Sequence, residues 1–333
     1  MGQSECSAMR RPILDIQHLK KYFPVTSGVF MRRTGNVHAV DDISFSVFKG
    51  ESLGIVGESG CGKSTLGRCI MGLYPLTQGR ILLDGKPLSA MTRKMRKTFS
   101  TRAQMIFQDP FESLNPRQTV RQILEEKFRI HGVSQQETAM QIELLLDQVG
   151  LDLGSLTKYP HEFSGGQRQR IGIARAISMT PQIVICDEPV SALDVSVQAK
   201  ILNLLLDLQS ALGLTYLFIS HDLSVVRHMS DRIIVMYLGR IMEIANSQDI
   251  YNHPTHPYTK ALLEAVPVAD PDRPSKRTPL QGEIPSAEHP PGGCRFSSRC
   301  PVARSLCFEK APTLSVCSHD PGHLTACHYP LSD

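Results

Sequence analysis

Short apolar runs of strand length recur along the first 240 residues of the chain. Runs rich in β-branched or aromatic residues and bounded by turn residues predict buried or half-buried strands. The first run should end at Pro24, because proline cannot donate to the hydrogen-bond ladder of a sheet. The predicted strands cover residues 13–23, 37–47, 52–56, 105–107, 183–186, 215–219 and 232–236.

Helical spacing of apolar positions fills the intervals between these strands. It is clear in residues 64–71 and 197–212, and it replaces the strand-like pattern altogether between about residues 110 and 163. Ser164 is a typical N-cap for a further helix that continues through residues 171–179. The alternation of strands and helices predicts an α/β fold with a largely parallel sheet, into which residues 110–163 form a helical insertion.

The composition changes after about residue 265. Prolines recur from Pro267 to Pro291, which predicts an extended, semi-rigid linker. Five of the nine cysteines then follow between Cys294 and Cys327. We therefore expect one large domain over residues 1–265 and a linker with a small Cys-rich region over residues 266–333.

The overall composition excludes several classes of protein. With 41% hydrophobic and 20% charged residues, the chain of 333 residues is typical of soluble globular proteins. The net charge of +4 gives no reason to expect a nucleic-acid partner. No apolar run approaches the ~20 residues of a membrane span, and the N-terminus resembles neither a signal peptide nor a myristoylation site. We expect a cytoplasmic protein that reaches a membrane only through a partner.

A glycine-rich loop joins a predicted strand to a predicted helix. The loop reads Gly57-Glu58-Ser59-Gly60-Cys61-Gly62-Lys63-Ser64-Thr65. It matches the pattern G-x-x-x-x-G-K-[ST], whose glycines let backbone N–H groups converge on phosphate oxygens at a helix N-terminus. Lys63 is expected to neutralise the β and γ phosphates, and the Ser64 hydroxyl to bind Mg²⁺. The loop therefore predicts binding of ATP or GTP.

Two acidic residues stand at the end of a buried strand. Asp187 and Glu188 follow the apolar residues 183–186, and strand ends are where α/β proteins contact their ligands. Asp187 can hold Mg²⁺, and Glu188 can polarise a water molecule for attack on the γ phosphate. Such a pair is common by itself, but the glycine-rich loop upstream makes it a candidate catalytic site.

A second helix start has phosphate-binding character. Ser164-Gly165-Gly166-Gln167 combines an N-cap serine with two glycines, and a purely structural cap would not need the glycines. Gln108 and His221 each follow a predicted strand, and neither indicates a function when taken singly.

In combination and order, these segments resemble ATP-binding cassette (ABC) ATPases. The sequence contains, in that family's order, the phosphate loop, Gln108, Ser164–Gln167, Asp187-Glu188, Ser191–Asp194 and His221. The Ser-Gly-Gly-Gln segment is specific to this class, and the likeness spans about residues 13–265. It implies an ABC-type nucleotide-binding domain with a RecA-like core, an antiparallel β subdomain and a helical insertion. It also implies an ATPase that uses ATP and Mg²⁺.

The resemblance further implies a paired arrangement. Cassettes of this family associate head to tail, so that Ser164–Gln167 of one subunit faces the ATP held by the phosphate loop of the other. Asp194 would lie at the dimer seam. Phe23 would stack on the adenine, with Tyr22 as the substitute.

The resemblance also assigns roles around the γ phosphate. Gln108 would join Ser64 and Asp187 at the Mg²⁺ ion. His221 would contact the γ phosphate and help Glu188 to position the attacking water.

Several segments narrow the likeness to one group of importers. They are Phe107–Pro110, Ser113–Pro116, Glu188–Gln198 and His256–Thr259. They most resemble the second ATPase, commonly lettered F, of bacterial dipeptide and oligopeptide importers. That likeness implies a location at the cytoplasmic face of the inner membrane. It also implies a second ABC ATPase, identical or different, two membrane permeases, and a periplasmic or lipid-anchored solute-binding protein.

The cysteines of the tail suggest a metal centre. Cys294, Cys300 and Cys307 form a C-x5-C-x6-C run, and Cys327 is the candidate fourth ligand. Four thiolates suit zinc or a [4Fe–4S] cluster, but zinc sites usually contain closely spaced pairs, so the spacing favours iron and sulfur. The resemblance favours the same group, because importer ATPases of this type can carry a cluster in this tail. Cys317 is an alternative ligand, and zinc or free thiols stay open.

Three functions are compatible with an ABC-type ATPase. The chain is expected to energise uptake of dipeptides or oligopeptides. The same role for nickel or another metal chelate, glutathione or an antimicrobial peptide is the alternative, since related ATPases serve all of these. A non-transport ABC protein generally has two cassettes or a coiled-coil insertion, and this sequence shows neither.

Overall fold

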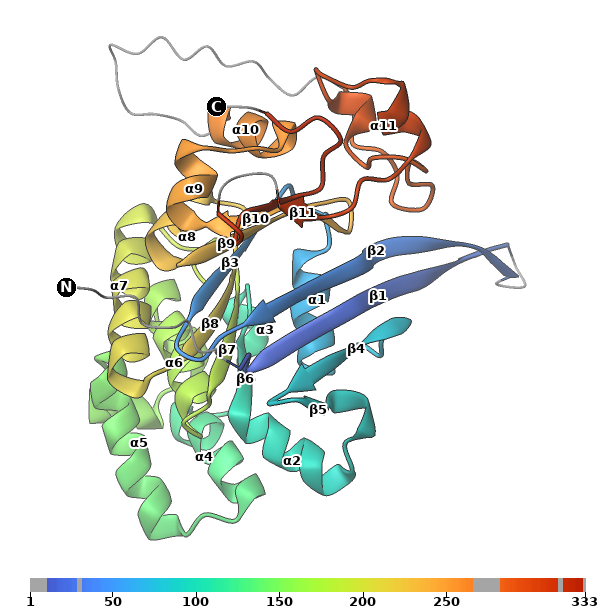
Figure 1. The fold of residues 1–333 in the computed structure, drawn as a ribbon. Helices are drawn as coiled ribbons and strands as arrows, with labels where there is room; N and C mark the ends of the chain where they lie inside the picture. Colours follow the sequence, from blue (N-terminus) through green and yellow to red (C-terminus); the bar gives the residue numbers. More distant parts are fainter. Residues whose placement is uncertain (1–10, 29–31, 266–281, 317–319, 332–333) are drawn as a thin grey trace, which may run out of the picture.

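Two sheets and eleven α-helices make up the described part of the computed structural model, which comprises residues 11–28, 32–265, 282–316 and 320–331 (Figure 1). The smaller sheet is antiparallel, in the order β2-β1-β4-β5, and the larger has the order β11-β12-β10-β9-β3-β8-β7-β6. The smaller sheet contains β1 (Leu14–Ser27), β2 (Arg32–Val47), β4 (Gln78–Leu83) and β5 (Lys86–Pro87). The larger contains β3 (Ser52–Val56), β6 (Ala103–Ile106), β7 (Ile183–Asp187), β8 (Thr215–Ile219), β9 (Arg232–Tyr237), β10 (Arg240–Asn246), β11 (Ser315–Val316) and β12 (Leu324–Thr325).

The centre of the larger sheet is parallel, as predicted. Strands β9, β3, β8, β7 and β6 are neighbours in parallel register. Every residue of β3, β7 and β8 is buried, because helices and the smaller sheet cover the faces of the larger sheet, and this explains their continuous apolar runs. The carboxyl ends of these strands meet at one edge of the sheet, where the candidate site lies.

Of the described helices, those at residues 63–70, 165–177 and 195–212 match segments predicted to be helical, whereas those at residues 93–102, 223–229, 247–252 and 305–309 were not predicted. The described helices are α1 (Lys63–Ile70), α2 (Arg93–Arg102), α3 (Pro110–Ser113), α4 (Val120–His131), α5 (Gln135–Val149), α6 (Gly165–Ile177), α7 (Val195–Leu212), α8 (Leu223–Met229), α9 (Ser247–Asn252), α10 (Pro257–Glu264) and α11 (Ser305–Glu309). The expected helical insertion is formed by α3, α4, α5 and two short 3-10 helices. Its longer helices have clear ends: Thr119 and Ser134 cap their N-termini, and Gly132 and Gly150 end them in the left-handed conformation.

The prediction that the first strand ends at Pro24 is wrong. Strand β1 continues to Ser27, with Pro24 opposite Asn36 of β2. The pairing of β1 with β4 has already ended at Lys20. One side of β1 is therefore free at Pro24, and a proline that cannot donate a hydrogen bond costs nothing there.

The Cys-rich tail packs onto the large domain. Strand β12 pairs with β10 and extends the main sheet, and Figure 1 shows the C-terminal segment in red beside β10 and above the β1–β2 hairpin. Cys294, Phe296 and Cys307 belong to the same buried core as the central strands. The proposed domain boundary at residue 265 stays a prediction, and the linker residues 266–281 lie outside the described part of the chain.

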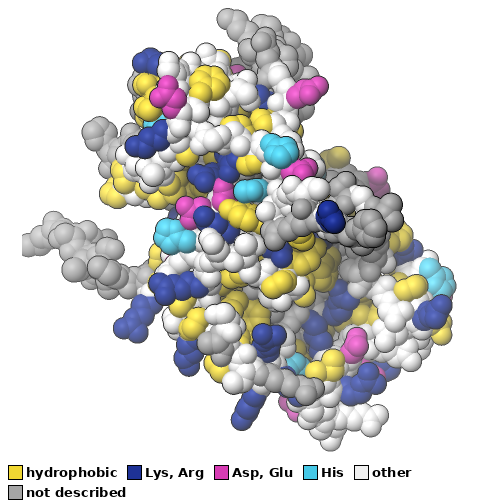
Figure 2. Space-filling model, turned by 90° about the vertical axis from the view of Figure 1, so that its right-hand side faces the viewer, with side chains coloured by type: hydrophobic (Ala, Val, Ile, Leu, Met, Phe, Trp, Pro, Cys, Tyr) yellow, Lys and Arg dark blue, Asp and Glu magenta, His cyan; other side chains and the backbone are white. Residues whose placement is uncertain are grey.

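The surface shows no dominant charge on the face drawn in Figure 2. Lys and Arg side chains are spread there among acidic, hydrophobic and uncharged ones.

Among the helices that the structure describes, none is both long and apolar enough to cross a bilayer.

Candidate nucleotide-binding site

The glycine-rich loop is shaped by two close backbone contacts. Gly57 has φ 153° and Gly62 has φ 106°, values that residues with a side chain rarely adopt. A Cβ atom on Gly57 would stand 2.1 Å from the carbonyl oxygen of Met236 in β9. A Cβ atom on Gly62 would stand 2.0 Å from that of Ala39 in β2. Only glycine fits at both positions, so the loop geometry depends on them.

Lys63 opens α1 with its ammonium group folded onto the loop. Its Nζ atom donates to the carbonyl oxygens of Gly57, at 2.7 Å, and Glu58, at 3.0 Å, and the residue is 4% exposed. The positive charge thus stands at the N-terminus of a helix, where phosphate is favoured. The loop can therefore present a cation and backbone donors to one anionic ligand.

A cavity of about 460 Å³ opens over this loop. Its lining consists of Val37, Ala39, Ser59, Gly60, Gly62, Lys63, Ser64, Thr65, Gln108, Glu188, His221 and Ala287. The structure thus brings together Gln108, Glu188 and His221, although Gln108 is 80 residues from Glu188 in the sequence. Val37, Ala39 and Ala287 were not predicted, since small apolar residues carry no recognisable signal.

Ser64 and Asp187 form a suitable Mg²⁺ site beside the cavity. The Ser64 hydroxyl donates to Oδ1 of Asp187 at 2.7 Å, while the buried Oδ2 of Asp187 has no hydrogen-bond partner. Burial raises the pKa of Asp187, although the Ser64 hydrogen bond and the positive charges of Arg68 and Lys63 lower it. A divalent cation would satisfy the unpartnered oxygen, and hydroxyl and carboxylate oxygens are ligands that Mg²⁺ prefers. The residues present therefore fit the ion.

Glu188 is held by groups on both carboxylate oxygens. Gln108 donates to Oε2 at 3.0 Å, and His221 Nδ1 lies 3.1 Å from Oε1. Glu188 itself has a positive φ of 47°, stabilised by a hydrogen bond from its backbone N–H to Ile219. Its side chain is 13% exposed, whereas that of His221 is 55% exposed. A carboxylate fixed in this way at the mouth of a phosphate site can orient a water molecule and accept its proton.

The segment Ser164–Gln167 caps α6, as predicted. The Ser164 hydroxyl accepts from the N–H of Gln167, whose side chain accepts in turn from the N–H of Ser164. Gly166 has a packing role that the sequence did not reveal, because a Cβ atom there would stand 2.5 Å from Val197 of α7. Gly166 is therefore required by helix packing as well as suited to binding an anion.

This helix start does not line the cavity of its own chain. Ser164 and Gln167 are exposed and are not among the residues that line the cavity. The loop before α7 lies beside them, since Leu193 contacts Gly165 and both Asp194 and Val195 are exposed. Val195 is 82% exposed, which is unusual for a large apolar side chain. The two segments form one outward-facing surface.

The two aromatic candidates for adenine contact lie on β1. Phe23 packs edge-to-face against Tyr74, with the rings 5.4 Å apart, and Lys21 lies over it. Tyr22 lies 4.2 Å from the ring of His38 and donates its hydroxyl to Asp41. Neither lines the cavity described above. Adenine stacking on Phe23 stays a prediction.

Four of the five tail cysteines, Cys294, Cys300, Cys307 and Cys327, gather in one region. Burial raises the pKa of the Cys294, Cys300 and Cys327 thiols, that of Cys327 to about 11, and charge on neighbouring thiols raises each further. Cys307 is among those neighbours for all three. In the described part of the chain, however, no group of three His, Cys, Asp or Glu side chains is arranged to hold a metal ion. Cys317 lies outside the described residues, so the cluster stays a prediction.

Comparison with known families gives two matches in this chain. The family model "ABC transporter" matches residues 40–191, and the model "Oligopeptide/dipeptide transporter, C-terminal region" matches residues 242–307. The solved structure of cbiO1 from Clostridium perfringens, part of the ABC transporter complex cbiONQ, is 28% identical with a TM-score of 0.63. The match with cbiO1 covers 73% of this chain and 92% of the cbiO1 chain. The ATP-binding cassette MJ0796, a dimer bound to ADP and Pi, is 26% identical with a TM-score of 0.62, over 70% and 98% of the two chains.

Full-length relatives place the chain more narrowly. It is 53% identical to the oligopeptide transport ATP-binding protein AppF of Bacillus subtilis, over 97% of this chain and 98% of that protein. It is 47% identical to OppF of Salmonella typhimurium, also an oligopeptide transport ATP-binding protein, over 92% and 93%. The chain therefore belongs to the ABC transporter family, in its group of oligopeptide transport ATP-binding proteins.

Proposed function

We propose that this chain hydrolyses ATP to energise the import of dipeptides or oligopeptides through partner membrane permeases. One observation carries the proposal. Residues of the phosphate loop line one cavity together with Gln108, Glu188 and His221, in a chain whose residues 242–307 match the C-terminal region of oligopeptide and dipeptide transporters. Relatives that match over almost their whole length are named for oligopeptide transport.

In the proposed mechanism, the loop residues and Lys63 hold the phosphates of ATP. The contact of Lys63 with Gly57 and Glu58 is exchanged for contact with phosphate oxygens. Ser64, Asp187 and Gln108 would hold Mg²⁺, which would neutralise the charge that develops on the phosphates. Glu188 orients water for in-line attack on the γ phosphate and accepts its proton, with its carboxylate fixed by Gln108 and His221. His221 also contacts the γ phosphate.

The exposed surface that contains Ser164–Gln167 and Asp194 supports a paired ATPase. Free N–H groups at the start of α6 are suited to an anion. Because this helix start does not line its own cavity, we assign it to the ATP of a second ABC ATPase, identical or different. The loop from Glu188 to Asp194 joins that surface to the catalytic carboxylate, since Ser191 donates to the carbonyl oxygen of Glu188 at 3.1 Å.

The remaining partners follow from the proposed transport role. An ATPase of this kind needs two membrane permeases to form the path and a solute-binding protein, periplasmic or lipid-anchored, to deliver the peptide. We place the chain at the cytoplasmic face of the bacterial inner membrane, attached peripherally through the permeases. No nucleic-acid partner is part of the proposal.

Uptake measurements in cells test this function. Replacing Lys63 with alanine should reduce uptake of labelled dipeptides and tetrapeptides by at least about 100-fold, since the phosphates lose their charge partner. The exposed Lys260→Ala variant, on α10, is the matched control and should transport normally. Peptide uptake that survived Lys63→Ala, with loss of nickel or glutathione uptake instead, would assign the chain to another cargo.

We also propose a [4Fe–4S] cluster on Cys294, Cys300, Cys307 and Cys327. The support is the convergence of four largely buried thiols whose charges influence one another. The raised pKa values keep Cys294, Cys300 and Cys327 protonated in the absence of a metal, so binding of a cluster would release their protons.

Anaerobic purification tests the cluster. The wild-type chain should be brown and contain about four iron atoms per chain, and Cys307→Ser should lose most of them. Cys69→Ser, which alters a buried cysteine of α1, is the matched control and should retain the iron. Stoichiometric zinc, or four thiols that react freely in the native protein, would contradict the cluster.

A further inference from the structure

The tail reaches the phosphate loop through Arg299. Both terminal nitrogens of this guanidinium donate to the carboxylate of Glu58, at 2.7 and 3.0 Å, and one also donates to the hydroxyl of Tyr237 at 3.2 Å. The Arg299 side chain is 6% exposed and that of Glu58 is 23% exposed, so the pair is largely shielded from water. A planar, two-point pair of this kind fixes both position and orientation.

Glu58 has every polar group engaged by the surrounding structure. Its side chain is held by Arg299, its N–H donates to the hydroxyl of Tyr258 at 3.0 Å, and its carbonyl accepts from Lys63. When Lys63 turns to the phosphates of ATP, the carbonyl keeps only the N–H of Cys61, at 3.3 Å, from within the loop. Arg299 and Tyr258 are then the contacts from outside the loop that hold Glu58 in place.

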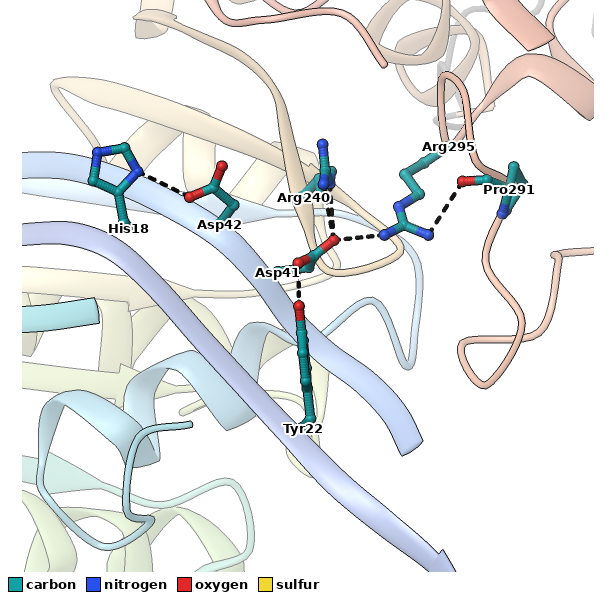
Figure 3. Close-up of polar contacts among 7 residues, drawn as sticks. All are labelled: His18, Tyr22, Asp41, Asp42, Arg240, Pro291 and Arg295. Carbon is teal, nitrogen blue, oxygen red and sulfur yellow. Dashed lines mark hydrogen bonds and ion pairs between the residues drawn. The ribbon is translucent and has the colours of Figure 1, made fainter. Parts of the chain in front are cut away.

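A second set of tail contacts holds the opposite wall of the cavity. Arg295 donates to Asp41 of β2 at 2.5 Å, as Figure 3 shows, and the same carboxylate accepts from Arg240 and Tyr22. The carbonyl oxygen of Ala287, a residue that lines the cavity, accepts from the N–H of His38 at 2.9 Å. His38 lies between Val37 and Ala39, the β2 residues of the lining, and Asp41 follows two residues after Ala39.

The network around Asp41 is closed and largely buried. In Figure 3, Asp41 stands between Tyr22 of β1, Arg240 of β10 and Arg295 of the tail. These partners lower the pKa of Asp41 to about 2 despite its burial, so it is charged at neutral pH. One carboxylate thus joins both strands of the hairpin, the main sheet and the tail.

We propose that Arg295 and Arg299 are positioning residues, through which the Cys-rich tail holds the β2 wall and the phosphate loop in the geometry that binds ATP. Neither arginine contacts the nucleotide in this proposal; each acts through a carboxylate of the cassette. The proposal rests on the phosphate loop being the ATP site, as proposed above. Its effect is on preorganisation, so it should appear in the affinity for ATP more than in the rate of the chemical step.

Nucleotide affinity and turnover, measured on the full chain in its assembled complex, test the proposal. Arg299→Gln should weaken binding of a fluorescent ATP analogue about tenfold, the size expected when a charge-assisted pair is lost, and raise KM similarly. It should leave kcat within about twofold. Arg299→Lys, which keeps the charge but not the two-point contact, should recover part of the affinity.

The controls separate positioning from a general loss of structure. Arg304→Gln removes an arginine of the same tail that packs over Tyr329, and it should bind ATP as the wild type does. If Arg299→Gln does not fold, Glu58→Gln tests the same contact from the other side with an isosteric side chain. In the double variant, the two effects should not add, because both remove one interaction.

The outcomes distinguish this proposal from the one on which it rests. Wild-type protein that failed to bind ATP, or bound it equally after Lys63→Ala, would contradict the assigned site. Wild-type protein that bound ATP, with Arg299→Gln and Glu58→Gln matching it in affinity and KM, would overturn the positioning role alone. A fall in kcat with unchanged KM would overturn it as well.

Discussion

Replacing Glu188 with glutamine should slow ATP hydrolysis in the assembled transporter by about 10²–10⁴-fold while ATP binding stays intact, since that range is typical for loss of a general base. Glutamine has the shape of glutamate and can accept from Gln108 or His221 through its remaining oxygen. It cannot take a proton from water. Turnover by phosphate release, together with affinity for an ATP analogue, measures the two effects separately.

The same variant reports on the proposed pairing. With hydrolysis blocked, ATP should hold the two ATPase subunits together, and light scattering should detect the pair only when ATP and Mg²⁺ are present. Glu264→Gln, at the exposed end of α10, is the matched control and should hydrolyse ATP normally. Normal turnover in Glu188→Gln would show that another group activates the water.

Replacing Gly62 with alanine should lower ATP affinity by at least about 100-fold, because the new methyl group cannot be placed without moving backbone. The Cβ atom would stand 2.0 Å from the carbonyl oxygen of Ala39, and the φ of 106° is unfavourable for any residue with a side chain. Backbone strain of this kind costs about 1–3 kcal/mol before the collision is counted. Calorimetric titration with ATP measures the loss.

Gly60 supplies a matched control in the same loop. It also has a positive φ, of 78°, but no atom lies within 4 Å of an added Cβ. Gly60→Ala should therefore carry only the local backbone cost of ~1–2 kcal/mol, and its affinity for ATP should fall only about tenfold. Equal losses in both variants would show that the close approach of β2 to the loop does not determine nucleotide binding.

Much of the fold could be predicted because its signals are local. The fully buried strands β3, β7 and β8 appear in the sequence as continuous apolar runs, and the loop between β3 and α1 is a contiguous motif. The end of β1 was misplaced because the meaning of Pro24 depends on β4, which stops pairing before it. Whether a strand has one neighbour or two at a given residue is not a local property.

The contacts of the tail could not be predicted for the same reason. Arg295 and Asp41 are 254 residues apart in the sequence, and Arg299 and Glu58 are 241 apart. No motif marks such a pair, because each arginine is an ordinary charged residue beside a cysteine. Gly166 is the opposite case. It belongs to a motif that is plain in the sequence, but its packing against Val197 depends on how α6 and α7 meet in the structure.

The pairing of β12 with β10 has a consequence for the solubility of the chain. Residues 241–245 of β10 are buried in succession, and Glu243 among them is fully buried with His323 of the tail as a partner. A chain cut at residue 265 would expose the free edge of this apolar strand, and such an edge is a template for aggregation. It would also leave the carboxylate of Glu243 without a charged neighbour. The tail thus protects the β10 edge of the sheet. A chain that lacks the tail would need another segment on this edge to avoid aggregation in solution.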